Sequence, residues 1–275
     1  MNIPQQTVIE PTKGWQLVNG PELLRYKDLF YFLVWKEIKV LYKQTILGLT
    51  WAIIRPLSTM VIFSIVFGKL ARIPSDGVPY PLFAFVALVP WTYFSTAITS
   101  SSNSLVSNTN LLTKVYFPRL IIPLTPVLSG LVDFAIALVV LTGMMAWFRI
   151  IPAWNLIFLP FLTLLMICTA SGIGMWLSAL AIQYRDIKFA VPFLVQLLLY
   201  AAPVVWPVSL VPPGYRFLYG LYPIAGVIEG FRSALLRTNP MPWDLIAMGT
   251  LSTTFLLFSG ALYFRKMERV FADVA

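Results

Sequence analysis

The stretch from Val191 to Leu236 most constrains how this chain folds, because it is almost wholly apolar and too long for one membrane crossing. A single helical crossing takes about 20 residues. Proline removes a helix hydrogen bond and clashes with the preceding turn. The stretch is broken by Pro203, Pro207, Pro212, Pro213 and Pro223.

In lipid, backbone groups freed by such breaks need partners inside the protein or beside a water-filled cavity. We therefore predict that the stretch enters the membrane, breaks, and folds back as a gate or pore lining. Glu229 and Arg232 lie near its far end, and a spacing of three lets them pair on one helical face. The alternative is a plain helical hairpin with prolines in its loop.

The composition indicates an integral membrane protein, because 59% of the residues are hydrophobic and only 11% are charged. Soluble domains are about 25% charged. We predict one membrane domain over residues 1–275 and no cleavable signal peptide, since no basic stretch precedes a short apolar core. The net charge of +9 fits cytoplasmic loops and anionic lipid better than nucleic acid.

The chain has no histidine and one cysteine, Cys168. These counts exclude an intrachain disulfide and disfavour a metal site or a histidine-based catalytic triad. No GxxxxGK(S/T) loop is present, so the chain lacks that means of holding ATP phosphates. We therefore predict that the protein is not an enzyme and has no cofactor of its own.

We divide the chain into a polar lead (1–21), a cytoplasmic interfacial helix (22–47), six spans (48–264) and a cytoplasmic tail (265–275). On the interfacial helix, Lys36, Lys39 and Lys43 fall opposite a broad apolar arc. That arc contains Phe30, Tyr31, Val34, Trp35, Ile38, Leu41 and Tyr42. The alternative is an amphipathic helix buried in a soluble core, which the composition disfavours.

The predicted fold is all-α, with a re-entrant helical segment between spans five and six. The spans are 49–70, 81–100, 120–148, 154–182, 189–208 and 245–264. Most lysines and arginines fall in segments on the same side as the N-terminus, so we expect both termini to be cytoplasmic. Reading residues 219–236 as a seventh span would bury Glu229 and Arg232 at a cost.

Asp133 is the only acidic residue predicted to lie deep in a span. An intramembrane acid is by default a functional candidate. With no row of acids to relay protons or sodium ions, we favour a structural hydrogen bond to a neighbouring helix.

Two cytoplasmic segments are candidates for docking a partner. Leu111 to Arg119 (LLTKVYFPR) mixes apolar, aromatic and cationic groups, and its apolar members are costly to leave in water. Gln183 to Lys188 is shorter and charged, and Arg185 and Asp186 could fix its shape. The alternative for both is an ordinary solvated loop.

From about Leu23 onward, this chain resembles the permease subunit of type-2 ABC exporters, in particular those that export O-antigen, capsule and teichoic acid. The resemblance depends on KxxxLGxxWxxxxP, here from Lys43 to Pro56, and on the segment from Pro223 through Glu229-Gly230-Phe231-Arg232. The family often has Asn before that proline, whereas this chain has Tyr222.

The resemblance implies a homodimer of permeases with two separate ATPase subunits that hold ATP and Mg²⁺. It implies that ATPase coupling falls to Leu111, Leu112, Lys114, Val115, Tyr116, Phe117, Pro118, Arg119, Arg185 and Asp186. The cytoplasmic entrance would be framed by Trp35, Lys36, Lys39 and Lys43. The transport path would run between the two protomers, with an extracytoplasmic gate at residues 204–236.

Aromatic rings stack on the CH faces of sugars, which suggests a gate and substrate path formed by Trp91, Tyr93, Phe94, Tyr200, Trp206, Tyr215, Tyr219 and Tyr222, with Glu229 and Arg232. Each ring has the alternative role of an interface anchor.

We therefore expect the membrane subunit of an ATP-driven exporter of lipid-linked polysaccharide in the bacterial inner membrane. The alternatives are a lipid, teichoic acid or drug exporter of the same family, a membrane-embedded transferase, and an ion-coupled transporter.

Overall fold

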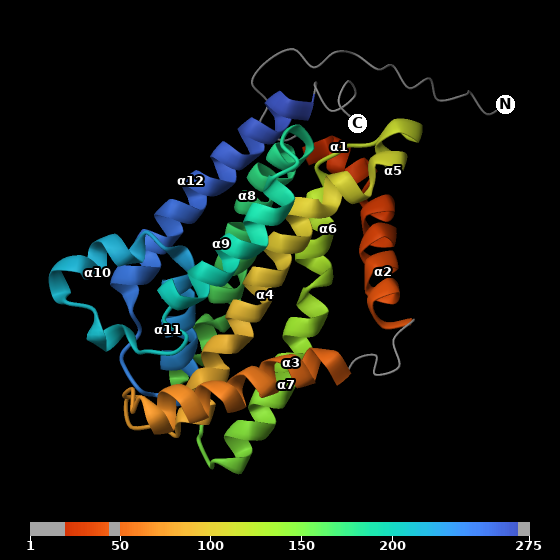
Figure 1. The fold of residues 1–275 in the computed structure, drawn as a ribbon. Coiled ribbons are helices and arrows are strands. Elements are labelled where there is room, and N and C mark those ends of the chain that lie inside the picture. Colours follow the sequence, from red (N-terminus) through yellow and green to blue (C-terminus); the bar gives the residue numbers. More distant parts are fainter. Residues whose placement is uncertain (1–19, 44–49, 269–275) are drawn as a thin grey trace.

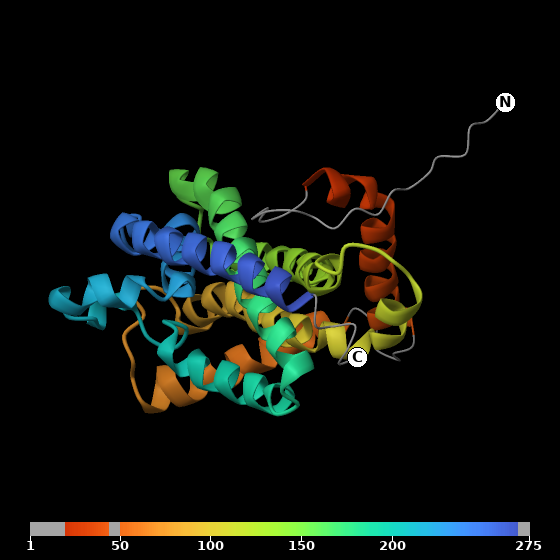
Figure 2. The ribbon, with the colours of Figure 1, turned by 90° about the horizontal axis from the view of Figure 1, so that it is seen from above.

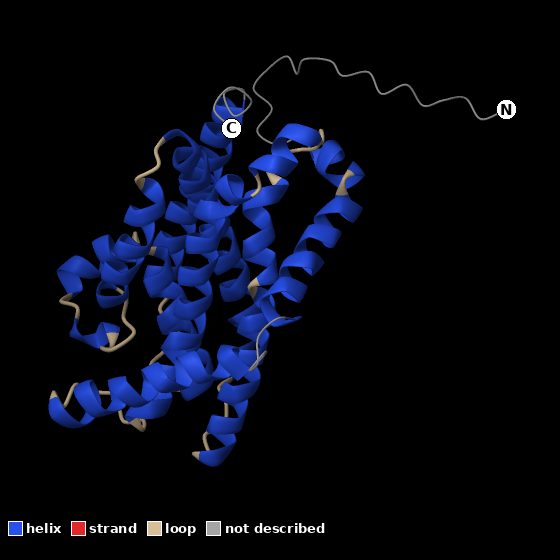
Figure 3. Ribbon diagram, turned by 45° about the vertical axis from the view of Figure 1, so that its right-hand side comes forward, coloured by secondary structure: helices blue, strands red, loops and turns tan. Residues whose placement is uncertain are grey.

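The protein is a helical bundle (Figures 1 and 3), seen in a computed structural model that describes residues 20–43 and 50–268. Within these ranges the ordered elements are all helical. Five apolar segments are long enough to cross a membrane: Thr50–Leu70, Tyr80–Ser107, Ile121–Trp147, Trp154–Gln183 and Trp243–Glu268. The prediction of an all-α, multi-pass membrane protein is confirmed.

The N-terminal half of the described chain runs as α1 (Gly20–Arg25), α2 (Lys27–Lys43), α3 (Thr50–Phe63) with the π-helical η1 (Ser64–Leu70), α4 (Tyr80–Ser107), α5 (Thr109–Lys114), α6 (Ile121–Ser129) and α7 (Leu131–Trp147). The C-terminal half runs as η2 (Trp154–Phe158), α8 (Leu159–Gln183), α9 (Ile187–Ala201), η3 (Val208–Leu210), α10 (Pro213–Gly220), α11 (Pro223–Leu236) and α12 (Trp243–Glu268).

The helix α4 forms the centre of the bundle, and it packs on α8, α6, α11, α7 and α3. In its most apolar window 78% of the residues are buried, against 6% for Thr50–Leu70. The apolar face of α4 therefore forms the core, while α3 and η1 lie at the periphery of the bundle. They run across the lower end of the bundle (Figure 1).

The fifth predicted span, residues 189–208, is shorter than expected. Its helix, α9, ends at Ala201, and its 15 residues rise about 22 Å at 1.5 Å each. That is less than the roughly 30 Å of a bilayer core. The prolines that follow end the helix early, so five helices rather than six have spanning length among the described residues.

The helix α2 lies along the side of the bundle (Figures 1 and 2) and packs on α6. Its buried residue is Leu33, which is not among the residues that we placed on the apolar arc. Tyr31 and Trp35, which we placed on the arc, remain exposed. The role of α2 as an interfacial helix stays a prediction. Residues 1–19 of the predicted polar lead and residues 44–49 at the end of the predicted interfacial helix and the start of the first span lie outside the described residues.

Two further boundaries differ from those predicted. The polar run from Ser100 to Ser107 continues α4 beyond the predicted end of the second span, and α5 is a separate short helix that precedes the third. The helix α12 continues past Phe264 to Glu268, so the predicted tail begins inside a helix. The rest of that tail, residues 269–275, lies outside the described residues.

Glycine permits a close helix contact between α8 and α12. A Cβ atom added at Gly172 would lie 2.8 Å from the backbone carbon of Leu256, and one added at Gly260 would lie 2.5 Å from the Gly172 carbonyl oxygen. Small residues let membrane helices approach in this way. The Thr169 and Thr253 hydroxyls share a hydrogen bond of 2.8 Å across the same interface.

We predict that Gly172→Ala destabilises the protein by about 1–3 kcal/mol, because the new methyl group meets backbone that cannot yield locally. Thermal unfolding in detergent would measure this loss. Gly143→Ala is the matched control, since a Cβ there meets nothing within 4 Å. Equal melting temperatures for the two variants would contradict the packing argument.

Candidate functional site

The break after α9 is capped by the polar tips of aromatic side chains. The last carbonyls of a helix have no partner within the helix. The Trp206 indole donates to the Tyr200 carbonyl at 3.3 Å, and the Tyr219 hydroxyl donates to the Ala201 carbonyl at 2.8 Å. The Tyr222 hydroxyl donates to the Leu198 carbonyl at 3.3 Å. These predicted gate residues therefore hold the end of α9.

Arg232 satisfies the next carbonyls of the break. Its Nη2 donates to the Val204 carbonyl at 2.9 Å, and its Nη1 donates to the Trp206 carbonyl at 3.3 Å. The guanidinium lies 3.6 Å from the centre of the Phe83 ring on α4. Tyr80, also on α4, donates its hydroxyl to the Val205 carbonyl at 2.8 Å. The freed backbone is thus paired inside the protein, as the prolines led us to expect.

The predicted Glu229–Arg232 pair is confirmed, with 3.3 Å between Nη1 and Oε2. Both side chains are buried, at 4% and 0% exposure, although we had expected the chain to avoid burying these charges. Burial is tolerated here because the charges are paired and hydrogen-bonded. Asn239 extends the network, since its amide donates to Asp76 at 2.9 Å and to Glu229 at 3.5 Å.

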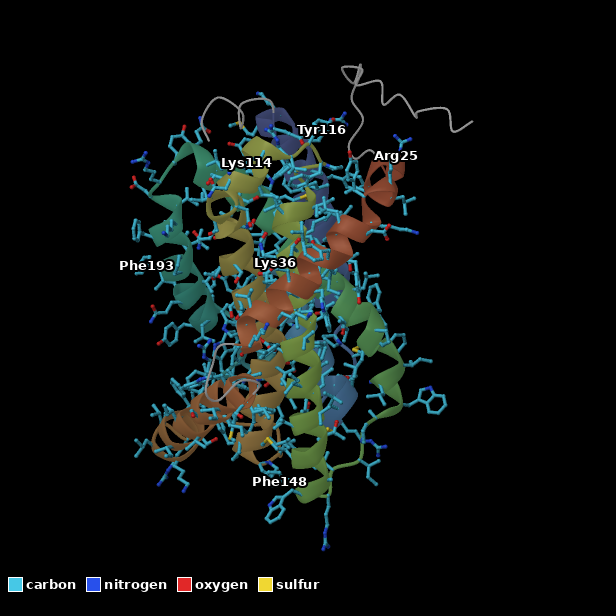
Figure 4. The ribbon with its side chains drawn as sticks, turned by 90° about the vertical axis from the view of Figure 1, so that its right-hand side faces the viewer. Arg25, Lys36, Lys114, Tyr116, Phe148 and Phe193 are labelled. Carbon is cyan, nitrogen blue, oxygen red and sulfur yellow. The ribbon has the colours of Figure 1, made fainter. Side chains whose placement is uncertain are left out.

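The predicted coupling segment divides into a buried part and an exposed part. Leu112 and Phe117 are buried in a small apolar cluster with α8 and α12. Lys114, Val115 and Tyr116 are exposed and lie at one extreme of the bundle (Figure 4). These three side chains are the part of the segment that can contact a partner.

The rest of the segment holds the chain's own structure. Arg119 donates a hydrogen bond of 2.7 Å to the Glu268 carbonyl at the end of α12. Leu111 packs partly against the buried cluster, and Pro118 is half-buried between these groups. The sequence suggested docking for all of them because it does not show which side chains the end of α12 covers.

The second predicted docking segment lies at the same end of the bundle, at the turn between α8 and α9 (Figure 1). Tyr184, Arg185, Asp186 and Lys188 are all exposed. Phe189 follows with 75% exposure. Both segments therefore present charged and aromatic groups at one end of the molecule.

A polar cavity of about 430 Å³ lies beneath α2, between α2, α4, α5 and α6. Glu37 of α2 lines it, and burial raises the pKa of this carboxyl group, while the Ser129 hydroxyl and Lys36 act in the opposite direction. We did not predict this cavity, because the sequence does not place α2 over the hydroxyl-rich end of α4.

A second cavity of about 280 Å³ contains Asp133. The Tyr42 hydroxyl of α2 donates a hydrogen bond to Asp133, which confirms the expected contact with a neighbouring helix. Arg55 lines the same cavity and stacks on Trp51, with 5.8 Å from its Cζ to the ring centre.

The remaining predicted path residues have varied positions. Trp91, Tyr93 and Phe94 are buried in the main core, so within this chain they serve packing, and Tyr93 also borders the Asp133 cavity. Tyr200 and Tyr215 are exposed. Trp35, Lys36, Lys39 and Lys43 line a shallow apolar groove of about 300 Å³ on α2, where the Lys39 ammonium lies 5.2 Å from the centre of the Trp35 ring.

Comparison with known proteins identifies the family. The model of the ABC-2 type transporter family matches residues 28–236, which is well over half of the chain. The chain belongs to the ABC-2 type transporter family. The match runs from α2 through the broken segment to the end of α11.

Curated relatives of this ABC-2 chain match over most of its length. The O-antigen export system permease protein RfbA of Myxococcus xanthus is 26% identical over 92% of this chain and 97% of its own length. The RfbA protein of Klebsiella pneumoniae is 25% identical over 90% and 95%. The polysialic acid transport protein KpsM of Escherichia coli is 23% identical over 85% and 91%.

We predict that Arg232→Met in this ABC-2 protein lowers the free energy of unfolding by about 3–5 kcal/mol, because Glu229 becomes an unpaired buried charge. The carbonyls of Val204 and Trp206 also lose their donor. Unfolding in detergent, followed by tryptophan fluorescence, would measure the change.

The matched control for this prediction is Arg237→Met. Arg237 also donates to a backbone carbonyl, that of Pro152 at 2.8 Å, but it is exposed. Its loss is expected to cost only about 1 kcal/mol. Similar decreases in the free energy of unfolding for Arg232→Met and Arg237→Met would contradict the prediction that the buried arginine contributes more to stability than the exposed one.

Proposed function

We propose that the protein is the transmembrane subunit of an ATP-driven exporter that moves a lipid-linked, O-antigen-like polysaccharide across the bacterial inner membrane. The observation that carries this proposal is the near full-length similarity to proteins named for O-antigen export and polysialic acid transport. ATP and Mg²⁺ would be held by separate ATPase subunits, and two copies of this chain would form the complex.

The proposed ATPase docking surface consists of Lys114, Val115, Tyr116, Arg185 and Asp186. Support comes from their exposure at one end of the bundle, where aromatic and charged groups lie together. Aromatic anchors with a charged rim are typical of protein interfaces. Other cations at that end are Arg25, Lys188, Arg265 and Lys266, which favours a cytoplasmic orientation with both termini inside.

We further propose that α9, the break, α10 and α11 jointly form the fifth membrane segment and the re-entrant gate, so that no single helix makes the fifth crossing. Supporting this, α9 is too short to cross alone, and the carbonyls of Ala201, Val204 and Val205, at its end and in the break, are paired with side chains of α10, α11 and α4. Irregular backbone at membrane depth is tolerated only where protein or a water-filled cavity surrounds it.

A second candidate is export of a lipid or drug by the same machinery. It draws on a relative whose name specifies no glycan, the inner membrane transport permease YadH of Escherichia coli strain K12, which is 26% identical over 69% of this chain and 77% of its own length. Surface glycan in strains with and without the chain would distinguish the two candidates. Unchanged surface glycan after deletion would favour the lipid or drug exporter.

We predict that Tyr116→Ala and Lys114→Glu uncouple the transporter. ATP hydrolysis by the reconstituted complex continues, while export falls about tenfold, which corresponds to a coupling energy within the usual 1–3 kcal/mol. The measurement is the ratio of glycan exported to ATP hydrolysed in proteoliposomes.

Trp154→Ala and Arg149→Glu are the matched controls, since both residues are exposed near the end of the bundle marked by Phe148 (Figure 4). They are expected to leave the ratio unchanged. A normal ratio in both Tyr116→Ala and Lys114→Glu would remove the docking surface from the proposal.

A further inference from the structure

One face of α4 carries an uninterrupted stripe of hydroxyl and amide side chains. At 100° per residue, the stripe falls within an arc of about 100°. It consists of Thr92, Thr96, Thr99, Ser100, Asn103 and Ser107. A polar stripe of this length on a membrane helix needs protein or ligand partners, because lipid offers none.

This stripe forms one wall of both cavities described above. Thr92 and Thr96 line the Asp133 cavity, and the other four line the cavity of about 430 Å³ beneath α2. The two cavities therefore reach α4 on successive turns. On α2 the adjacent residues Val40 and Leu41 contact one cavity each. We refer to the two cavities together as the track, which lies under α2 and reaches Leu111 of α5.

The lining of the larger cavity is rich in acceptors. The Thr99 and Thr125 hydroxyls donate their protons to backbone carbonyls one turn earlier, at 2.8 Å each, so their oxygens keep free lone pairs. The Asn103 amide donates to the Thr99 carbonyl at 3.2 Å. Its buried Oδ1 atom has no hydrogen-bond partner in the part of the chain that the structure describes.

A buried acceptor without a donor costs about 1–3 kcal/mol, so a ligand hydroxyl group that reached this atom would relieve that cost. Among the described residues, the charged groups that line the cavity are Lys36 and Glu37, so the lining offers no cluster of like charges to hold an ionic partner. A phosphate headgroup would need an excess of cations or backbone N–H groups. The cavity volume lies within the roughly 300–1,000 Å³ of small-molecule sites.

We infer that the track under α2 is a holding site for a short stretch of neutral glycan inside each protomer. Sugar hydroxyls would donate to Asn103, Thr99 and the neighbouring serines, and Asp133 with Arg55 would receive the next unit. This inference rests on the proposed function and adds an intraprotomer site to the path expected between protomers.

The test measures how fast a cysteine in the track reacts with a membrane-impermeant maleimide in inverted inner-membrane vesicles. The background is Cys168→Ser, which removes the native thiol. Asn103→Cys and Ser107→Cys report on the larger cavity. Ser107→Cys replaces only one oxygen atom with sulfur, so it is the variant that should fold normally if Asn103→Cys does not. The ATPase partner is inactivated so that glycan stays on the transporter.

Labelling of both track cysteines is expected to be about fivefold slower in vesicles from glycan-producing cells than in vesicles from cells that lack the first glycosyltransferase. Val106→Cys, exposed on α4 and outside both cavities, is the control and should label alike in the two. Equal labelling of the track cysteines in the two vesicles would overturn the inference. Slow labelling of the track cysteines in both kinds of vesicle, relative to Val106→Cys, would indicate that a lipid fills the track. That result would also overturn the inference.

A second readout uses export. Asn103→Leu is expected to reduce surface glycan about tenfold, while Asn103→Gln retains most of it. If deletion of the whole chain abolishes surface glycan but the track cysteines show no protection, only the track is wrong. If deletion leaves surface glycan unchanged, the proposed function and the track fail together.

Discussion

The structure depends on the contact between a buried guanidinium and a broken backbone. Proline ends α9 early, and the chain must then pass through irregular backbone while surrounded by apolar groups. Arg232 makes this tolerable, because it donates to the carbonyls of Val204 and Trp206 and pairs with Glu229. Three tyrosines around the break add further hydrogen bonds to its carbonyls and to those at the end of α9, and α11, which carries Arg232, is buried along its whole length.

The two ends of the molecule therefore have different characters. The break, its paired charges and the Asp76–Asn239 contact form a polar network linked by hydrogen bonds and an ion pair, although Arg232 Nε has no partner among the described residues. The end with α5 and the α8–α9 turn instead leaves Lys114, Tyr116 and Arg185 exposed. A hydrogen-bonded polar network resists motion, whereas exposed groups can bind partners. This division agrees with an ABC-2 subunit that takes its driving force from outside the chain.

Apolar run length predicted five of the spanning helices, because a membrane crossing imposes a minimum length that the sequence displays directly. The prolines predicted the break and helical spacing predicted the Glu229–Arg232 pair. The partners of the break were not predictable, since Tyr80 and Phe83 come from more than 100 residues away. Ser100 to Ser107 was assigned to a loop on polarity alone, yet it is helical because its polar side chains face a cavity.

The hydrogen bond from Arg119 to the last carbonyl of α12 joins the segment after α5 to a single long helix. That helix packs on α10 and α11 farther along its length. Since α12 is continuous over Trp243–Glu268, it can move as one rigid helix. A tilt imposed at its C-terminal end, near Arg119, displaces its N-terminal end in proportion to the length of the helix. Because α12 also packs closely on α8, mechanical work done on the segment around Arg119 would reach the broken segment through these two helices moving together.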